Sequence, residues 1–569
     1  MKNFFNDNSL LQHYLRHPAM ERIIALREGR FEEAAHYPFA PQDTADAHLC
    51  YRLAMEQLGA LCGEAFAPEA ATVDREGCRV EKGRARYGEA MQRHLERLTE
   101  SGFWALSLPR DHEGLNFPTT LFVMATELIA RADSSLACLW ALQNCGQTIA
   151  SAGNDEQRAS YLRRIAHGAT CAMVLTEPNA GSDLQSARLE ATFDEERQQW
   201  YLNGIKRFIT NGDADLKLIL ARSEAGSSDG RGLSLFLHDK AWGGVTVRRT
   251  EHKLGIRGTA TCELHFHNTP VELVGVRRMG LIKYVMALMN SARLGIGAQA
   301  VGIAEAALRE AEQYAREREQ FGKPIATLAP IQELLALGRA RLEACRALLY
   351  ETARMVDLID GLSAKTDLDA EELAELRHRR QLCDLYTPIL KLMAGEYCNT
   401  ICYDALQVHG GAGYMADFPI ERLVRDARVV TIYEGTSQMQ VVAALRHTMD
   451  GMLVEELHQL SRTLFGHGVL PNEKRRLAAL VNKFSEAVRA VATMNGGSER
   501  HGRRLVECGG VLLMSLLLVA EAEREPQLVS SASLFVTEAD SLLAAHTRRI
   551  TALKDDHWAA MNETYNSKG

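Results

Sequence analysis

The chain lacks the cysteine spacing that metal and disulfide sites require. Its 12 cysteines are scattered over 569 residues without a CxxC pair, so the sequence indicates neither a zinc ribbon nor a disulfide framework. Cys398 and Cys402 lie one helical turn apart, but a metal site would need further ligands nearby, and two small apolar helix residues are the better interpretation. No metal site is predicted, and a reducing environment is expected.

The chain also lacks an excess of basic residues and a long apolar run. A formal net charge of -8 and a pI near 6.2 argue against a protein built mainly to bind nucleic acid, because that affinity normally rests on a basic face. The most apolar run, Gly509–Ala520, is too short to span a bilayer and predicts a buried helix. The first residues fit neither a signal peptide nor a transit sequence. We therefore expect a cytoplasmic protein without stable membrane insertion.

What is present is a change of periodicity along the chain. After an N-terminal extension (1–42), apolar residues at helical spacing dominate 43–168, and short β-rich runs separated by Gly, Asn and Asp occupy 169–279. Long helical patterns return over 280–445, and a further helical region with nearly balanced charge covers 446–569. The sequence therefore predicts a mainly α protein with a central β-domain.

Two segments of the β-domain carry residues suited to contact a ligand. The loop LTEPNAGSDL offers the hydroxyls of Thr176 and Ser182 and exposed backbone N–H groups around Gly181. KRFITNG ends a strand with Phe208 and Thr210, which are separated by one residue and are expected on the same side of the strand. Alone, the first is better read as an ordinary turn and the second as a core aromatic beside a turn.

Two later segments are richer in charge and glycine. REREQFGKPI ends a long helix, where Arg318 could bind a pyrophosphate and Phe321 could stack on a flat ring, although such a helix end is usually solvated surface. QVHGGAGY has glycines that permit close backbone approach. Beyond it, Glu434 lies in a turn between an aromatic residue and a glycine. An apolar pocket there would raise the pKa of this carboxyl toward the range useful to a base, whereas a lone turn carboxylate would ordinarily be exposed.

Together these segments resemble the acyl-CoA dehydrogenase family. TEPNAGSD, FITNG, REREQFGKP, HGGAGY and RDARVVTIYEGTSQMQ occur in the family's order and at its spacing between about Asp43 and Arg446. KLGIRGTATCELHF and NSARLGIGAQ are most similar to long bacterial members with extra terminal segments, such as 3-methylmercaptopropionyl-CoA dehydrogenase-like enzymes. The resemblance implies an N-terminal helical bundle, a β-barrel, a four-helix bundle and, in this chain, extra C-terminal helices.

The resemblance also implies an FAD site shared between subunits, with Arg318 reaching the FAD diphosphate of a neighbouring subunit. A shared cofactor implies a homo-oligomer, and we favour a dimer. Ala329 stands where the family commonly has a Gln that touches FAD, so that contact is in doubt. The implied cofactor residues are Leu175, Thr176, Gly181, Ser182, Phe208, Ile209, Thr210, Arg318, Gln320, Phe321, Gln407, Val408, His409, Gly410, Gly411, Thr436 and Gln438.

Glu434 falls on the family's usual position for the catalytic base. It would remove the α-proton of an acyl-CoA thioester while the β-hydrogen leaves as hydride to the flavin, giving a 2,3-enoyl-CoA. Ser182, Arg293 and Gly435 are the implied substrate contacts. Some members place the base immediately before an Arg of the long helix, but that position is Ala292 here. The family implies an electron-transfer flavoprotein as the electron acceptor.

Two other functions stay open. The first is an acyl-CoA oxidase-like flavoenzyme, which would produce peroxide without another acceptor. The second is a flavin-binding scaffold or nucleic-acid-associated relative without significant turnover. A strongly basic C-terminal extension would favour the scaffold, and the nearly balanced segment after Arg446 does not.

Overall fold

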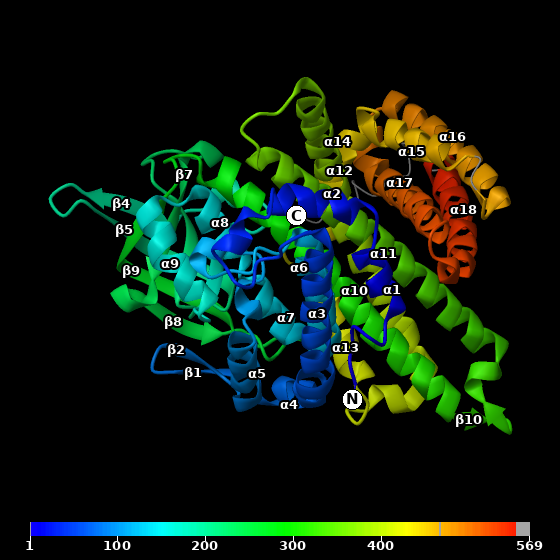
Figure 1. Cartoon of the computed structure of the whole chain (residues 1–569), viewed down its shortest axis with the longest axis horizontal. Helices are drawn as coiled ribbons and strands as arrows, with labels where there is room; N and C mark the ends of the chain where they lie inside the picture. The colour runs from blue at the N-terminus through cyan, green and yellow to red at the C-terminus, as the bar shows by residue number, and fades with distance from the viewer. Residues whose placement is uncertain (1, 466–467, 553–569) are drawn as a thin grey trace, which may run out of the picture.

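The computed structural model describes residues 2–465 and 468–552, and most of its helices lie to one side of a β-domain (Figure 1). Two helices, α1 (Ser9–Leu15) and α2 (Ala19–Glu28), come first. The N-terminal helical part follows, with helices α3 (Thr44–Leu61), α4 (Ala67–Glu76), α5 (Glu89–Glu100), α6 (Thr119–Ala132), α7 (Ser134–Ala141), α8 (Asn144–Ala152) and α9 (Asp155–Ala166).

A small hairpin interrupts these helices and was not anticipated from the sequence. Strands β1 (Cys78–Glu81) and β2 (Arg84–Tyr87) pair antiparallel. Both turn residues, Lys82 and Gly83, have left-handed φ of 52° and 74°, as a tight hairpin turn requires. The strands carry so many charged residues that they show no clear alternation of apolar and polar positions. The sequence pattern therefore did not predict them.

The central β-domain closes on itself. Its strand order is β3-β6-β4-β5-β9-β7, β7 also pairs with β6, and β8 pairs with β9. Leu202, Phe236 and Leu264 are fully buried within it. The predicted fold class of helices, β-barrel and helices is confirmed. The strands are β3 (Cys171–Val174), β4 (Glu190–Asp194), β5 (Gln199–Thr210), β6 (Leu216–Arg222), β7 (Leu233–Asp239), β8 (Val245–Thr250) and β9 (Thr261–Val274).

Long helices form the next part. They are α10 (Met286–Glu317), α11 (Ala329–Ala364), α12 (Ala370–His409), the short α13 (Ile420–Ala427) and α14 (Ser437–Met449). The hairpin of β10 (Glu319–Gln320) and β11 (Lys323–Pro324) joins α10 to α11 at the end of these helices that lies farthest from the β-domain (Figure 1).

A buried ion cluster fixes the packing of these helices. Arg346 of α11 donates to Glu127 of α6 at 2.7 Å and to Glu305 of α10 at 2.8 Å, and all three side chains are buried. Since removing Arg346 would leave Glu127 buried without its cation, costing about 3–5 kcal/mol, the cluster specifies how α6, α10 and α11 meet. Both α6 and α10 contribute to the site described below.

The C-terminal helices pack beside α11 and α14 (Figure 1). They are α15 (Met452–Leu464), α16 (Pro471–Thr493), α17 (Gly497–Ala522) and α18 (Val529–Ala552). Two helical segments of the described chain are long and apolar enough to cross a membrane, Gly497–Ala522 and Pro526–Ala552, with 89% and 33% of their apolar windows buried. The apolar run Gly509–Ala520 is therefore the buried part of a longer helix. Residues 553–569 of this predicted region lie outside the described residues.

Helix α1 packs against helices from two later parts of the chain. Tyr14 of α1 stacks on Tyr350 of α11, with ring centroids 4.3 Å apart. His13 Nε2 lies 2.8 Å from the carboxylate of Glu521 on α17. The N-terminal segment is thereby held against both the central bundle and the C-terminal helices.

Candidate active site

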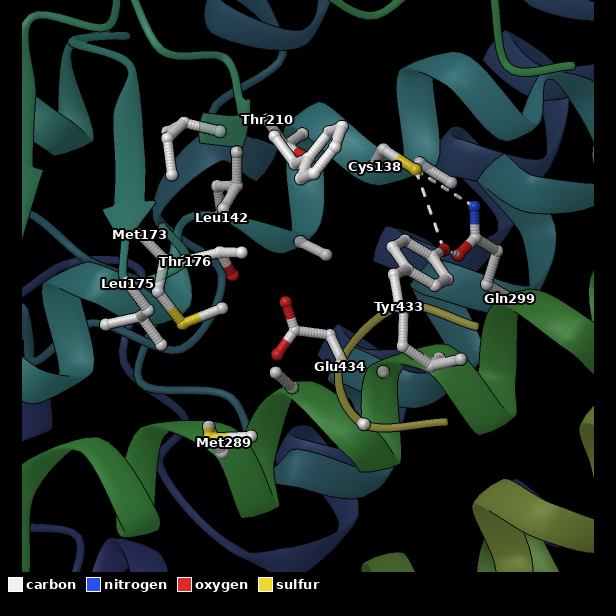
Figure 2. A pocket seen from close by; sticks show the side chains of 18 of the residues that line it. Cys138, Leu142, Met173, Leu175, Thr176, Thr210, Met289, Gln299, Tyr433 and Glu434 are labelled. Atoms are coloured by element: carbon white, nitrogen blue, oxygen red, sulfur yellow. Dashed lines mark hydrogen bonds between the residues drawn. The ribbon is translucent and has the colours of Figure 1, made fainter. Parts of the chain in front are cut away.

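A pocket lies where α7, α10, the β-domain and the turn before α14 meet (Figure 2). The space between its lining residues, including its open mouth, is about 910 Å³. Among its lining residues, the following were predicted as site residues: Leu175, Thr176, Gly181, Phe208, Ile209, Thr210, Glu434 and Gly435. The N-terminal helices and α10 supply others, including Thr126, Ala137, Cys138, Met289 and Ala292.

Glu434 lies in a constrained turn, and its carboxylate points into the cavity (Figure 2). Glu434 and Gly435 have left-handed φ of 53° and 86°, a conformation that a non-glycine residue adopts only when its surroundings enforce it. The carbonyl of Gly435 accepts hydrogen bonds from Lys391 Nζ at 2.6 Å and Gln440 Nε2 at 3.0 Å. Thr436 then caps α14 by accepting from the N–H of Met439. The strained turn is held from both sides.

The surroundings of Glu434 favour a base. Burial raises the pKa of Glu434 to about 7, and the opposing charges of Arg293 and Lys391 limit that rise. Arg293 comes from α10, where it donates to Asn290 at 3.0 Å. Within the described residues, the backbone N–H of Glu434 has no hydrogen-bond acceptor. The turn therefore presents a carboxylate able to take a proton near neutral pH, beside a free donor.

A polar cluster flanks Glu434 (Figure 2). The hydroxyl of Tyr433 donates to the side-chain oxygen of Gln299. The amide nitrogen of Gln299 donates to the carbonyl of Ser134 at 3.1 Å and contacts the sulfur of Cys138 at 3.2 Å. These bonds fix the orientation of Tyr433 and hence the direction in which the chain enters the turn at Glu434.

Buried contacts place the two predicted β-domain segments at the pocket. Lys206 of β5 is fully buried, pairs with Glu177 at 2.9 Å and donates to the carbonyl of Leu175 at 2.7 Å. Burial lowers the pKa of Lys206 to about 8. The pairing register of β5 with β9 shifts between Lys206 and Ile209, where Phe208 has φ 61°. Strict alternation therefore fails at this bulge, although Phe208 and Thr210 both line the pocket.

A second cavity adjoins the first and shares Cys138, Thr210 and Tyr433 with it. It encloses about 690 Å³ between the β-domain and the α13 region. Lys253, Thr261, Arg428 and Ile432 are among its other lining residues. The two cavities therefore meet at these three residues.

The remaining predicted cofactor residues do not line the first pocket. Ser182 and Gln438 are exposed, and Thr436 caps α14. Arg318 and Gln320 are exposed at the β10–β11 hairpin, as is Phe321, which is 88% exposed. Gln407, Val408, His409, Gly410 and Gly411 lie at the end of α12, where Val408 and His409 are buried and the others exposed.

The hairpin is too far from the pocket of its own chain to contact the same part of a ligand. Ile296 of α10 lines the pocket, and Arg318 follows the end of the same helix. At 1.5 Å per residue, about 30 Å of helix separates them. The structure thus brings one group of predicted residues together at the pocket and places the others outside it, most of them exposed.

Three neighbours of the site were missed by sequence reasoning. Lys391, Gln299 and Cys138 belong to helices whose packing alone brings them to the turn. A signal existed for Lys391, because it is a single charge in the apolar run YTPILKLMAG, and a charge at such a position needs a buried partner. Nothing in the sequence distinguished Gln299 or Cys138.

Comparisons with known proteins agree with this architecture. Acyl-CoA dehydrogenase family models match residues 51–169 (N-terminal domain), 172–269 (middle domain), 282–448 (C-terminal domain) and 450–557 (a further C-terminal model). The 3-methylmercaptopropionyl-CoA dehydrogenase of Ruegeria pomeroyi is 33% identical over 415 residues, which cover 68% of this chain and 69% of that protein. The acryloyl-CoA reductase (NADH) of Anaerotignum propionicum is 33% identical over 362 residues, covering 63% and 86%.

A solved structure of similar shape is the FAD complex of an acyl-CoA dehydrogenase from Bacillus anthracis. Its TM-score is 0.74 at 24% identity, covering 89% of this chain and 88% of that chain. At this identity the likeness shows the fold alone. The fold and the family models together define an oxidoreductase class with an added C-terminal helical part. The chain belongs to the acyl-CoA dehydrogenase family.

Proposed function

We propose that this chain is an FAD-dependent acyl-CoA dehydrogenase that converts an acyl-CoA thioester to the 2,3-enoyl-CoA, with Glu434 as the base. The position of Glu434 carries the proposal: its carboxylate points into a largely apolar pocket between domains, and its pKa is raised to about 7. A base is most effective when its pKa is close to the operating pH.

The residues around the two cavities fit FAD. Within the described chain the hydroxyls of Thr176 and Thr210 have no hydrogen-bond partner, and Phe208 is 51% exposed beside them. These groups suit the polar edge and the flat face of a flavin ring. FAD, when bound, supplies the acceptor for the β-hydrogen with its electron pair. Arg318 and Phe321 suit the diphosphate end of FAD in a neighbouring subunit, since they are exposed far from their own pocket.

The chain's own residues would move the α-proton and stabilise the charge it leaves. A Glu434 carboxylate oxygen takes the proton from the α-carbon as that C–H bond breaks. The free N–H of Glu434 is suited to donate to the thioester oxygen, where negative charge develops. Because the turn is already fixed by Lys391 and Gln440, neither group needs to reorganise during the step.

We also propose a cytoplasmic homodimer that passes its electrons to an electron-transfer flavoprotein. The dimer is supported by the distance between the pocket and the exposed hairpin of the same chain. A cofactor held by both a pocket and a hairpin would therefore lie between two chains. The support for the acceptor is the family to which the chain belongs.

The test is anaerobic mixing of the purified flavoprotein with a panel of acyl-CoA thioesters, followed by flavin absorbance. Bleaching with particular thioesters, and formation of their 2,3-enoyl products, is the expected result. Bound FAD that no thioester bleaches would contradict the proposal and favour a scaffold. Rapid peroxide formation in air would favour an oxidase.

A further inference from the structure

Lys391 is a cation placed where a helix interior would ordinarily be apolar. It lies in the middle of α12, is 1% exposed, and is preceded and followed by apolar residues. Its Nζ donates to the carbonyl of Gly435 at 2.6 Å. Burying an ammonium group is costly unless a partner compensates it, and one neutral carbonyl offers only part of that compensation. The rest must come from a negative charge nearby.

The charged groups around Lys391 identify that partner. Burial lowers the pKa of Lys391 to about 8, whereas Glu434 raises it, Arg293 of α10 lowers it, and Glu396, further along α12, raises it more weakly. Glu396 is itself bound to Ser437 at 2.6 Å and to Arg503 of α17 at 3.1 Å. Glu434 is therefore the main anion facing Lys391, with Arg293 as the competing cation.

Tyr433 and Cys138 are the other titratable groups at the turn. Burial raises the pKa of each, so both are neutral near pH 7 and do not supply the missing charge. The balance at the turn consists of one carboxylate and two cations, of which only Lys391 also holds the backbone of the turn.

We propose that Lys391 is a positioning residue for the base: its ammonium group holds the Gly435 carbonyl and supplies the positive charge that keeps the Glu434 carboxylate ionised. The inference rests on the proposed function for its catalytic meaning, but the electrostatic coupling exists in the protein without substrate. When Glu434 takes the substrate proton, Lys391 is left without its anion, and the attraction of its ammonium group for the ionised carboxylate favours release of that proton after turnover.

Matched variants separate the two roles of the lysine. Lys391→Met removes both the hydrogen bond and the charge, Lys391→Gln keeps a donor but removes the charge, and Lys391→Arg keeps the charge. Gln440→Leu is the control, because it removes the neutral donor to the same Gly435 carbonyl and leaves the charges unchanged. If Lys391→Met does not fold, the Gln and Arg variants still show whether the charge of Lys391 acts on Glu434.

The experiment is an infrared pH titration of the Glu434 carboxyl in the flavin-loaded protein without substrate, with Glu434→Gln identifying the band. We expect the titration midpoint to rise by about one pH unit in Lys391→Met and Lys391→Gln, because loss of an opposite charge favours the neutral carboxyl. The midpoint should stay near the wild-type value in Lys391→Arg and Gln440→Leu. An unchanged midpoint in the Met and Gln variants would overturn the inference.

The rate of flavin bleaching by an acyl-CoA provides the second measurement. For Lys391→Gln we expect about a fivefold slower rate at pH 7, because a midpoint about one unit above 7 lowers the ionised fraction from about one half to about one tenth. The rate should recover at higher pH, and loss without any recovery would contradict the charge role. If wild-type protein does not bleach, the proposed function fails, while the infrared titration still decides whether Lys391 controls Glu434.

Discussion

The pocket around Glu434 and the surface formed by the β10–β11 hairpin differ in how complete they are. At the pocket, the turn is strained, and buried ions such as Lys206 and Lys391 have hydrogen-bonding partners within the same chain. At the hairpin, Arg318 and Phe321 point outward, and Phe321 is 88% exposed. The proposed dimer accounts for this difference: the pocket would come from one chain, and part of the cofactor contacts would come from the hairpin of a second chain.

The largest expected effect comes from removing the base. Glu434→Gln should lower the rate of flavin bleaching by an acyl-CoA by roughly 10²–10⁴-fold, the usual contribution of general-base catalysis, because no second carboxylate lines the pocket within the described part of the chain. FAD content should match wild type, since the turn geometry survives. Stopped-flow absorbance measures the rate. Substantial residual bleaching would show that another residue is the base.

The next effect concerns stability on the β-domain side of the pocket. Lys206→Met leaves Glu177 buried without its cation, so we expect a loss of about 3 kcal/mol in the free energy of unfolding of the apoprotein. Urea unfolding followed by circular dichroism measures it. Arg79→Met, which breaks the exposed pair with Glu81, is the control and should leave the midpoint unchanged. Equal effects of the two variants would show that Lys206 does not anchor the loop that contains Leu175 and Glu177.

A smaller effect is expected from a change at the β10–β11 hairpin. Arg318→Ala should weaken FAD binding by about 10–100-fold, corresponding to a charge-assisted hydrogen bond, without changing the fold. Fluorescence titration of the apoprotein with FAD measures this. At limiting FAD, co-expressing this variant with Glu434→Gln should restore activity, because a hybrid dimer contains one site with both an intact base and a neighbour's arginine. No recovery in isolated hybrid dimers would show that the cofactor is held within one chain.

The smallest effect is on pH dependence. With a pKa of about 7, Glu434 is mostly ionised above that pH and protonated below it. Only the ionised form can accept a proton, so the bleaching rate at saturating thioester should fall by about tenfold from pH 8 to pH 6. A rate that rises as pH falls over this range would contradict the assignment of an acidic group as the base.

The fold and the centre of the site could be predicted because they rest on local pattern and motif spacing. Periodicity separated the helices from the β-domain, and the segments around Thr176, Phe208 and Glu434 meet at one pocket. The bulge at Phe208 could not be predicted, since it depends on the register of β5 against β9. Gln299 and Cys138 were missed because helix packing alone brings them to Tyr433.

The role of Glu434 is tested most directly by exchange of the α-hydrogen of an acyl-CoA with D₂O, followed by NMR under anaerobic conditions. This reaction needs the base and the fixed turn, but it does not need net oxidation. The account predicts that flavin-loaded wild type exchanges the α-hydrogen of those thioesters that bleach the flavin, and that Glu434→Gln falls to the uncatalysed background. Exchange by Glu434→Gln at the wild-type rate would contradict it.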